Sequence, residues 1–104
     1  MLLRELAHAR SGDKGGTSDI TVVAFDAAGY DVVRHELSAD RVREHFPDLP
    51  ISAVDRYEIP QLLALKFVLH GALGRGVTQT LNLDAHGKSL SSCLLGLSMR
   101  AEHE

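Results

Sequence analysis

The sequence of 104 residues has little of several residue types that particular functions require. It contains one cysteine, so no disulfide can form within the chain, which suits a reducing compartment such as the cytoplasm. Tryptophan is absent and aromatic residues make up only 5%, too few for the stacking surface that single-stranded nucleic acid needs. The net charge of -3 is mild, and lysine and arginine form no cluster. We therefore expect a cytoplasmic protein that does not bind nucleic acid.

Long hydrophobic runs are also missing. The most apolar stretch, residues 62–73, is interrupted by Lys66 and His70 and is too short to cross a bilayer. The first residues lack the apolar segment of a signal peptide. With 24% charged and 44% apolar residues, the composition is that of one folded domain spanning residues 1–104, with no membrane segment.

The hydrophobic patterns predict four strands and three helical segments. The strands are expected at residues 3–9, 20–25, 52–59 and 77–83. The helices are expected at residues 31–46, at residues 61–73, and along a stripe of Leu90, Cys93, Leu94 and Leu97. Ser38 is a candidate N-cap, and Cys93 is expected to be a small core residue and not a nucleophile. Helices that bury one face against the same strands predict an α+β two-layer sandwich, with the helices packed on one face of about four strands.

The expected helix at residues 61–73 is apolar almost all round. One sheet covers only part of such a helix, so the remainder must be covered by the neighbouring helix, by another subunit or by a larger partner. This pattern favours a homo-oligomer or docking on a partner protein.

Residues 8–20, HARSGDKGGTSDI, place three glycines, several hydroxyls and a lysine between the first two expected strands. A loop of this composition can direct successive backbone N–H groups onto an anion, and Lys14 adds a positive charge. The candidate ligand-binding residues in it are Ser11, Gly12, Asp13, Lys14 and Gly15. The alternative is a plain strand connection made of turn residues, because the glycine spacing is neither that of a P-loop nor that of a dinucleotide fingerprint.

Two further features extend this candidate site. Residues 71–76, GALGRG, offer Arg75 as the charge of a second anion-binding element, although a helix stop before a strand explains the same pattern. His8 and His70 each lie beside a glycine-rich turn, so they are candidates to face a shared cleft; the alternative is a structural, hydrogen-bonded role for each.

Candidates for catalysis or metal binding are few. Asp13 and Lys14 form a conceivable acid–base pair, but solvated loop charges explain them better. The six histidines show none of the close spacings of zinc ligands, so we expect no metal site and no cofactor.

Three segments resemble a known family. ARSGDKG at residues 9–15, FVLHGALG at residues 67–74 and LDAHGK at residues 83–88 are similar to the small ferredoxin-like C-terminal domain of the acyclic terpene utilisation (AtuA-like) proteins. In that family the domain commonly follows a much larger one or is a separate small protein. The resemblance implies a ferredoxin-like α+β fold and a setting in the catabolism of acyclic terpenes or related branched acyl-CoA compounds.

The resemblance is closest at residues 11–15, to which a shared family role is carried over. The chain departs from the family pattern at three positions. Gly16 stands where the family usually has aspartate, and Asp19 and Lys66 stand where it often has asparagine.

Three functions follow as hypotheses. The first is an accessory subunit or detached domain that docks on a larger AtuA-like partner and contributes the SGDKGG loop to a joint site. The second is a small lyase or hydratase acting alone on an acyl-CoA, with Asp13 and His8 as acid and base and the glycine loops holding phosphate or thioester oxygen. The third is a non-catalytic oligomeric protein that binds an anionic small molecule.

Overall fold

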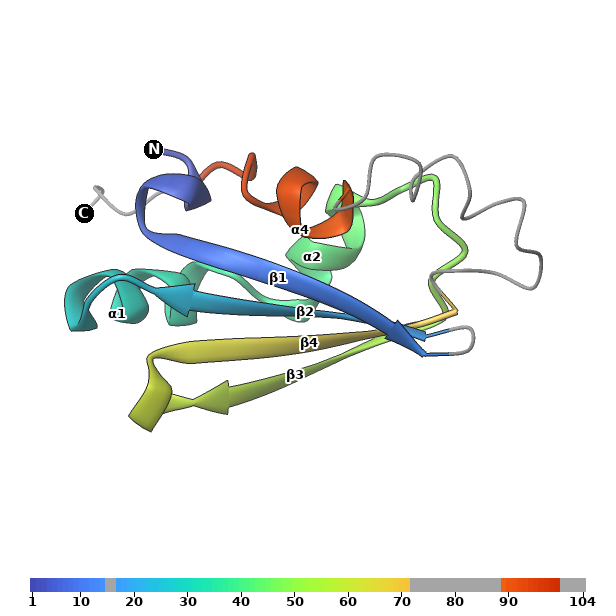
Figure 1. Ribbon diagram of the computed structural model, residues 1–104. Helices are drawn as coiled ribbons and strands as arrows, with labels where there is room; N and C mark the ends of the chain where they lie inside the picture. The colour runs from blue at the N-terminus through green and yellow to red at the C-terminus, as the bar shows by residue number, and fades with distance from the viewer. Residues whose placement is uncertain (15–16, 72–88, 100–104) are drawn as a thin grey trace.

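The computed structural model describes residues 1–14, 17–71 and 89–99. Its four strands, β1 (Ala7–Lys14), β2 (Thr17–Ala24), β3 (Ala53–Ile59) and β4 (Ala64–His70), form one antiparallel sheet in the order β1-β2-β4-β3. Its helical elements are η1 (Leu3–Glu5), α1 (Ala27–Glu36), α2 (Ala39–His45), η2 (Pro60–Leu62) and α4 (Ser89–Leu94). The helices lie on one side of the sheet, so the expected α+β two-layer sandwich is confirmed (Figure 1).

The sheet consists of two hairpins joined at its centre. β1 pairs with β2, β3 pairs with β4, and β2 and β4 lie next to each other. The pair of helices α1 and α2 connects the first hairpin to the second. This four-stranded sheet with its helices is consistent with a ferredoxin-like fold.

The core lies between the sheet and the helices. Along β2 the side chains alternate between half-buried and buried, and the buried set includes Ile20 and Val22. Residues from the helices complete this cluster, among them Val33, Leu37, Val42 and Leu94. The period of two follows from the pleat, which points successive side chains to opposite faces.

Residues 64–70 are a central strand, so the helix expected at residues 61–73 is wrong. Leu65, Phe67 and Leu69 are buried on the helix side, while Lys66 and Val68 alternate with them on the opposite face. A strand with neighbours on both edges is apolar along most of its length, and a short run of this kind looks the same in a buried helix. Because residues 64–70 form a strand, their apolar character no longer indicates a partner or a second subunit.

The helix expected at residues 31–46 is two helices. Ser38 caps α2, because its Oγ accepts a hydrogen bond from the Arg41 amide at 3.1 Å, as its sequence position predicted. The first of the two helices begins earlier than expected, at Ala27, where the Asp26 carboxylate accepts a hydrogen bond from the Gly29 amide at 2.7 Å. The strand expected at residues 52–59 is confirmed as β3.

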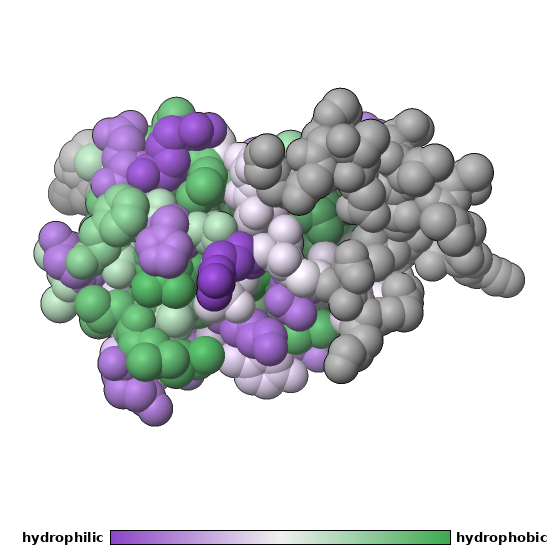
Figure 2. Space-filling view, viewed as in Figure 1, coloured by the Kyte–Doolittle hydropathy of each residue, from purple (hydrophilic) through white to green (hydrophobic). Residues whose placement is uncertain are grey.

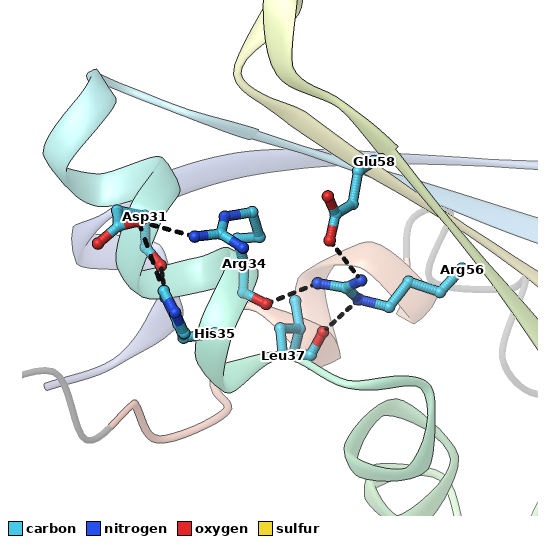
Figure 3. A network of polar contacts seen from close by, with 6 residues as sticks. All are labelled: Asp31, Arg34, His35, Leu37, Arg56 and Glu58. Atoms are coloured by element: carbon cyan, nitrogen blue, oxygen red, sulfur yellow. Dashed lines mark hydrogen bonds and ion pairs between the residues drawn. The ribbon is translucent and has the colours of Figure 1, made fainter.

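Arg56 of β3 ties the sheet to the end of α1. Its Nε donates to the Leu37 carbonyl at 3.0 Å and its Nη2 to the Arg34 carbonyl at 2.6 Å, while Nη1 meets the Glu58 carboxylate at 2.9 Å (Figure 3). The last carbonyls of a helix have no hydrogen-bond partner within the helix, so these donors satisfy them. The positive charge of the guanidinium also interacts favourably with the negative end of the helix dipole.

The described C-terminal segment returns to the N-terminus. The Leu3 amide donates to the Leu97 carbonyl at 2.8 Å, and the Arg4 amide donates to the Leu95 carbonyl at 3.0 Å. In α4, Leu90 and Leu94 are buried as expected, but Cys93 is exposed, so its assignment to the core is wrong. The strand expected at residues 77–83 falls outside the described ranges. In the part of the chain that the structure describes, no helix is both long and apolar enough to traverse a membrane.

Candidate functional site

The sheet has one face turned away from the helices, which we call the open face. Strand alternation and the pairing register assign its members. They are His8, Arg10 and Gly12 of β1, Thr17, Asp19, Thr21 and Val23 of β2, Ala64, Lys66, Val68 and His70 of β4, and Ala53, Asp55, Tyr57 and Ile59 of β3. Figure 2 shows hydrophobic residues gathered toward the end of the molecule that holds α1, with hydrophilic ones nearer its middle.

The stretch expected to be a long anion-binding loop is a β-hairpin. β1 starts at Ala7, later than the strand expected at residues 3–9, and continues to Lys14; β2 starts at Thr17, so only residues 15 and 16 separate the strands. Successive N–H groups of an extended strand point to opposite sides, so residues 11–14 do not form the converging amides of an anion nest. Loop composition misled the prediction here, because serine, glycine and aspartate continue a strand wherever a neighbour pairs with it.

The structure places the motif residues individually. Ser11 is on the helix side, where its Oγ lies 3.4 Å from that of Ser91. Gly12 is paired with Asp19 on the open face, and its carbonyl accepts from the Ser18 hydroxyl at 3.0 Å. Asp13 and Lys14 lie in β1, with the described structure limited to their backbone. A ligand-binding role for these residues stays a prediction.

Among the described histidines, His70 is the one that the fold brings to the hairpin. In the register it lies opposite Thr17, which in turn lies opposite Lys14. Its Nε2 is 2.8 Å from the Asp55 carboxylate, and the two side chains are 43% and 49% exposed. Sequence reasoning named His70 but missed Asp55, whose only signal was its alternation along the strand expected at residues 52–59.

His8 is far from this group. It stacks on Phe25 with ring centroids 6.0 Å apart, at the opposite end of the open face. Six residues of strand separate the His8 level from the His70 level, or about 20 Å. The two histidines therefore do not share a cleft, and Asp13, five residues along β1 from His8, is too distant to act with it as an acid–base pair.

The middle of the open face carries charges that sequence reasoning did not combine. Arg10, Thr21, Lys66 and Tyr57 form one row across all four strands. The next row toward the hairpin contains Gly12, Asp19, Val68 and Asp55. Gly15 and Arg75, the remaining candidates, lie beyond the described ranges. Among described residues no group of three histidine, cysteine or acidic side chains is placed to hold a metal ion.

Comparison with known families settles the relationship that the motifs suggested. The profile of the AtuA ferredoxin-like domain matches residues 1–100. This chain belongs to the AtuA ferredoxin-like domain family. Neither the curated proteins nor the solved structures contain a match to the chain. Two of the three positions at which this AtuA ferredoxin-like domain departs from the expected family pattern, Asp19 and Lys66, lie on the open face.

Proposed function

We propose that this AtuA ferredoxin-like domain is an accessory subunit that docks on a larger AtuA-type protein. It contributes the hairpin end of its open face to a joint site for an anionic substrate, with an acyl-CoA as the expected class. The observation that carries the proposal is the hydrogen-bonded His70–Asp55 pair beside Thr17 at the hairpin, with both side chains close to half exposed.

A pair of this kind is suited to moving a proton. The Asp55 carboxylate fixes the orientation of the His70 ring through Nε2 and leaves Nδ1 to meet a ligand. The Thr17 hydroxyl and the Lys14 position share its register row, which adds a donor and a positive residue.

The exposure of the pair argues for a partner. Proton transfer and charge stabilisation are most effective where water is excluded and the local dielectric is low. Side chains that are 43% and 49% exposed are well hydrated in the isolated chain. A larger protein bound over the hairpin end excludes water from the pair, whereas a lyase or hydratase acting alone has to use the pair while it is exposed to solvent.

The test is a binding titration with the large AtuA-type protein from the same source. We expect the wild type to bind, and Asp55→Asn and His70→Gln to bind at least about tenfold more weakly, the effect of losing roughly 1.4 kcal/mol at an interface. A matched control exists on α1, where Asp31 and His35 form a similar exposed contact, with Nδ1 of His35 2.9 Å from the Asp31 carbonyl. His35→Gln should leave the affinity unchanged.

Other outcomes separate the alternatives. If the isolated chain is stabilised against heating by coenzyme A esters and turns them over, with both effects lost in His70→Gln, the stand-alone enzyme is correct. If the chain neither binds the large protein nor responds to coenzyme A esters, the accessory role is wrong.

A further inference from the structure

Two neighbouring rows of the open face carry opposite charges. The basic row is Arg10, Thr21, Lys66 and Tyr57, and the acidic row is Gly12, Asp19, Val68 and Asp55. Arg10, Lys66 and Asp19 make no ion pair with any residue that the structure describes, and Asp55 is held by His70 alone. The middle of the sheet therefore presents charges of both signs that this copy of the chain does not use.

We propose that the open face binds the open face of a second copy, about a two-fold axis that runs across the strands between these two rows. Such an axis keeps each strand opposite its own counterpart and reverses the order of the rows. The acidic row of each copy then faces the basic row of the other, and the strands of the two sheets lie antiparallel, within the aligned class of sheet packing.

The side chains fit at the level of single residues. Asp19 comes opposite Thr21 of the second copy, between its Arg10 and Lys66. Lys66 comes opposite Val68 of the second copy, between its Asp19 and Asp55. Every contact occurs twice, as a two-fold interface requires.

The surroundings of Gly12 agree with this pairing of charges. Gly12 comes opposite Arg10 of the second copy, and the Asp19 carboxylate lies over Gly12, with its Oδ1 3.6 Å from where a Cβ would stand. Arg10 of the second copy therefore meets an acidic group at this position. Val23, Val68 and Ile59 are partly buried, and they add apolar contact to the charged centre.

The other face-to-face arrangement is excluded by charge. A two-fold axis parallel to the strands keeps each row opposite itself. Lys66 then lies opposite Thr21 of the second copy, between Arg10 and Lys66 of that copy. The acidic row of each copy likewise faces the acidic row of the other. Like charges placed together at an interface are strongly unfavourable, so the axis across the strands is selected.

This dimer does not depend on the proposed function. The second copy covers Asp55 and His70, so one chain cannot use this pair for a larger protein and form the dimer at the same time. Loss of the dimer is measured with the purified chain alone, and loss of the accessory role only with the large protein.

The experiment uses charge reversal in sedimentation or light-scattering measurements of mass. The wild type is expected at twice the mass of the chain. Asp19→Lys and Lys66→Asp each place like charges at two symmetric contacts, and each should raise the dimer dissociation constant about a hundredfold or more. Glu44→Lys, an exposed acid on α2 in the helical layer, should change nothing.

Mixing the two reversed variants gives the decisive result. In a mixed dimer the lysine introduced by Asp19→Lys faces the aspartate introduced by Lys66→Asp, and the native Lys66 and Asp19 meet at the second contact. Two chains that are monomeric alone should therefore form a heterodimer. Recovery on mixing also shows that both variants are folded. The milder variants Asp19→Asn and Lys66→Gln should weaken the dimer by about tenfold.

Three results would overturn the proposal. One is a wild type that remains monomeric at about 1 mM, the limit of even weak association. Another is a dimer that neither reversal weakens, since its interface must then lie elsewhere. The third is a pair of folded, monomeric variants that do not associate when mixed.

Discussion

Arg56 donates from Nε to the Leu37 carbonyl, 3.0 Å away, and so joins an edge strand to the end of the first helix. The same guanidinium reaches the Arg34 carbonyl, which leaves two terminal carbonyls of α1 satisfied by a side chain of the sheet. The contact lies on the helix side, where a polar group without a partner is costly.

Replacing Arg56 should destabilise the fold. Arg56→Met keeps much of the aliphatic bulk but removes the donors, and we expect a loss of about 2 kcal/mol in the free energy of unfolding, measured in urea. Arg34→Ala is the control, because its side chain pairs with Asp31 on the helix surface. That change should cost less than about 0.5 kcal/mol. Equal losses from the two substitutions would contradict the role assigned to Arg56.

Because residues 64–70 form a strand, the stability lost on substitution should alternate from one residue to the next. Leu65→Ala, Phe67→Ala and Leu69→Ala should each cost roughly 2 to 5 kcal/mol, because all three side chains are fully buried. Leu62→Ala should cost little, since Leu62 is 62% exposed. Denaturant unfolding of the four variants gives the pattern. A large loss for Leu62 with a small one for Phe67 would support the helix that the sequence suggested.

The position of Cys93 predicts its reactivity. An exposed thiol reacts with a disulfide reagent at nearly the same rate in the native and the denatured protein. A buried core cysteine reacts only after unfolding. We therefore expect one equivalent of thiol to be titrated rapidly without denaturant, and Cys93→Ser to leave the melting temperature unchanged. Slow labelling in native buffer would mean that Cys93 is buried, as the sequence suggested, and would contradict this prediction.

Local signals predicted the elements that local physics determines. Ser38 was recognisable as an N-cap because its side chain bonds an amide only three residues away. The strand at residues 20–25 was recognisable from its β-branched and apolar residues. In the structure, buried and half-buried side chains alternate along β2.

The errors arose where pairing partners far along the chain decide the structure. The motif at residues 11–14 has the composition of a loop, but pairing with residues 17–20 extends it as strand. Residues 64–70 have the hydrophobicity of a buried helix, but β2 and β3 hold them between two strands. The charged rows of the open face became visible only with the register, because Arg10, Asp19 and Lys66 come from three strands.

The central claim is that the sheet face opposite the helices is the surface with which this protein binds others. The most direct measurement is the attenuation of valine methyl NMR signals by a soluble paramagnetic chelate, with the buried Val22 and Val33 as references. In the wild type, Val68 should be shielded nearly as well as these references, and in Lys66→Asp it should become strongly attenuated. Equal and strong attenuation of Val68 in both proteins would contradict the claim.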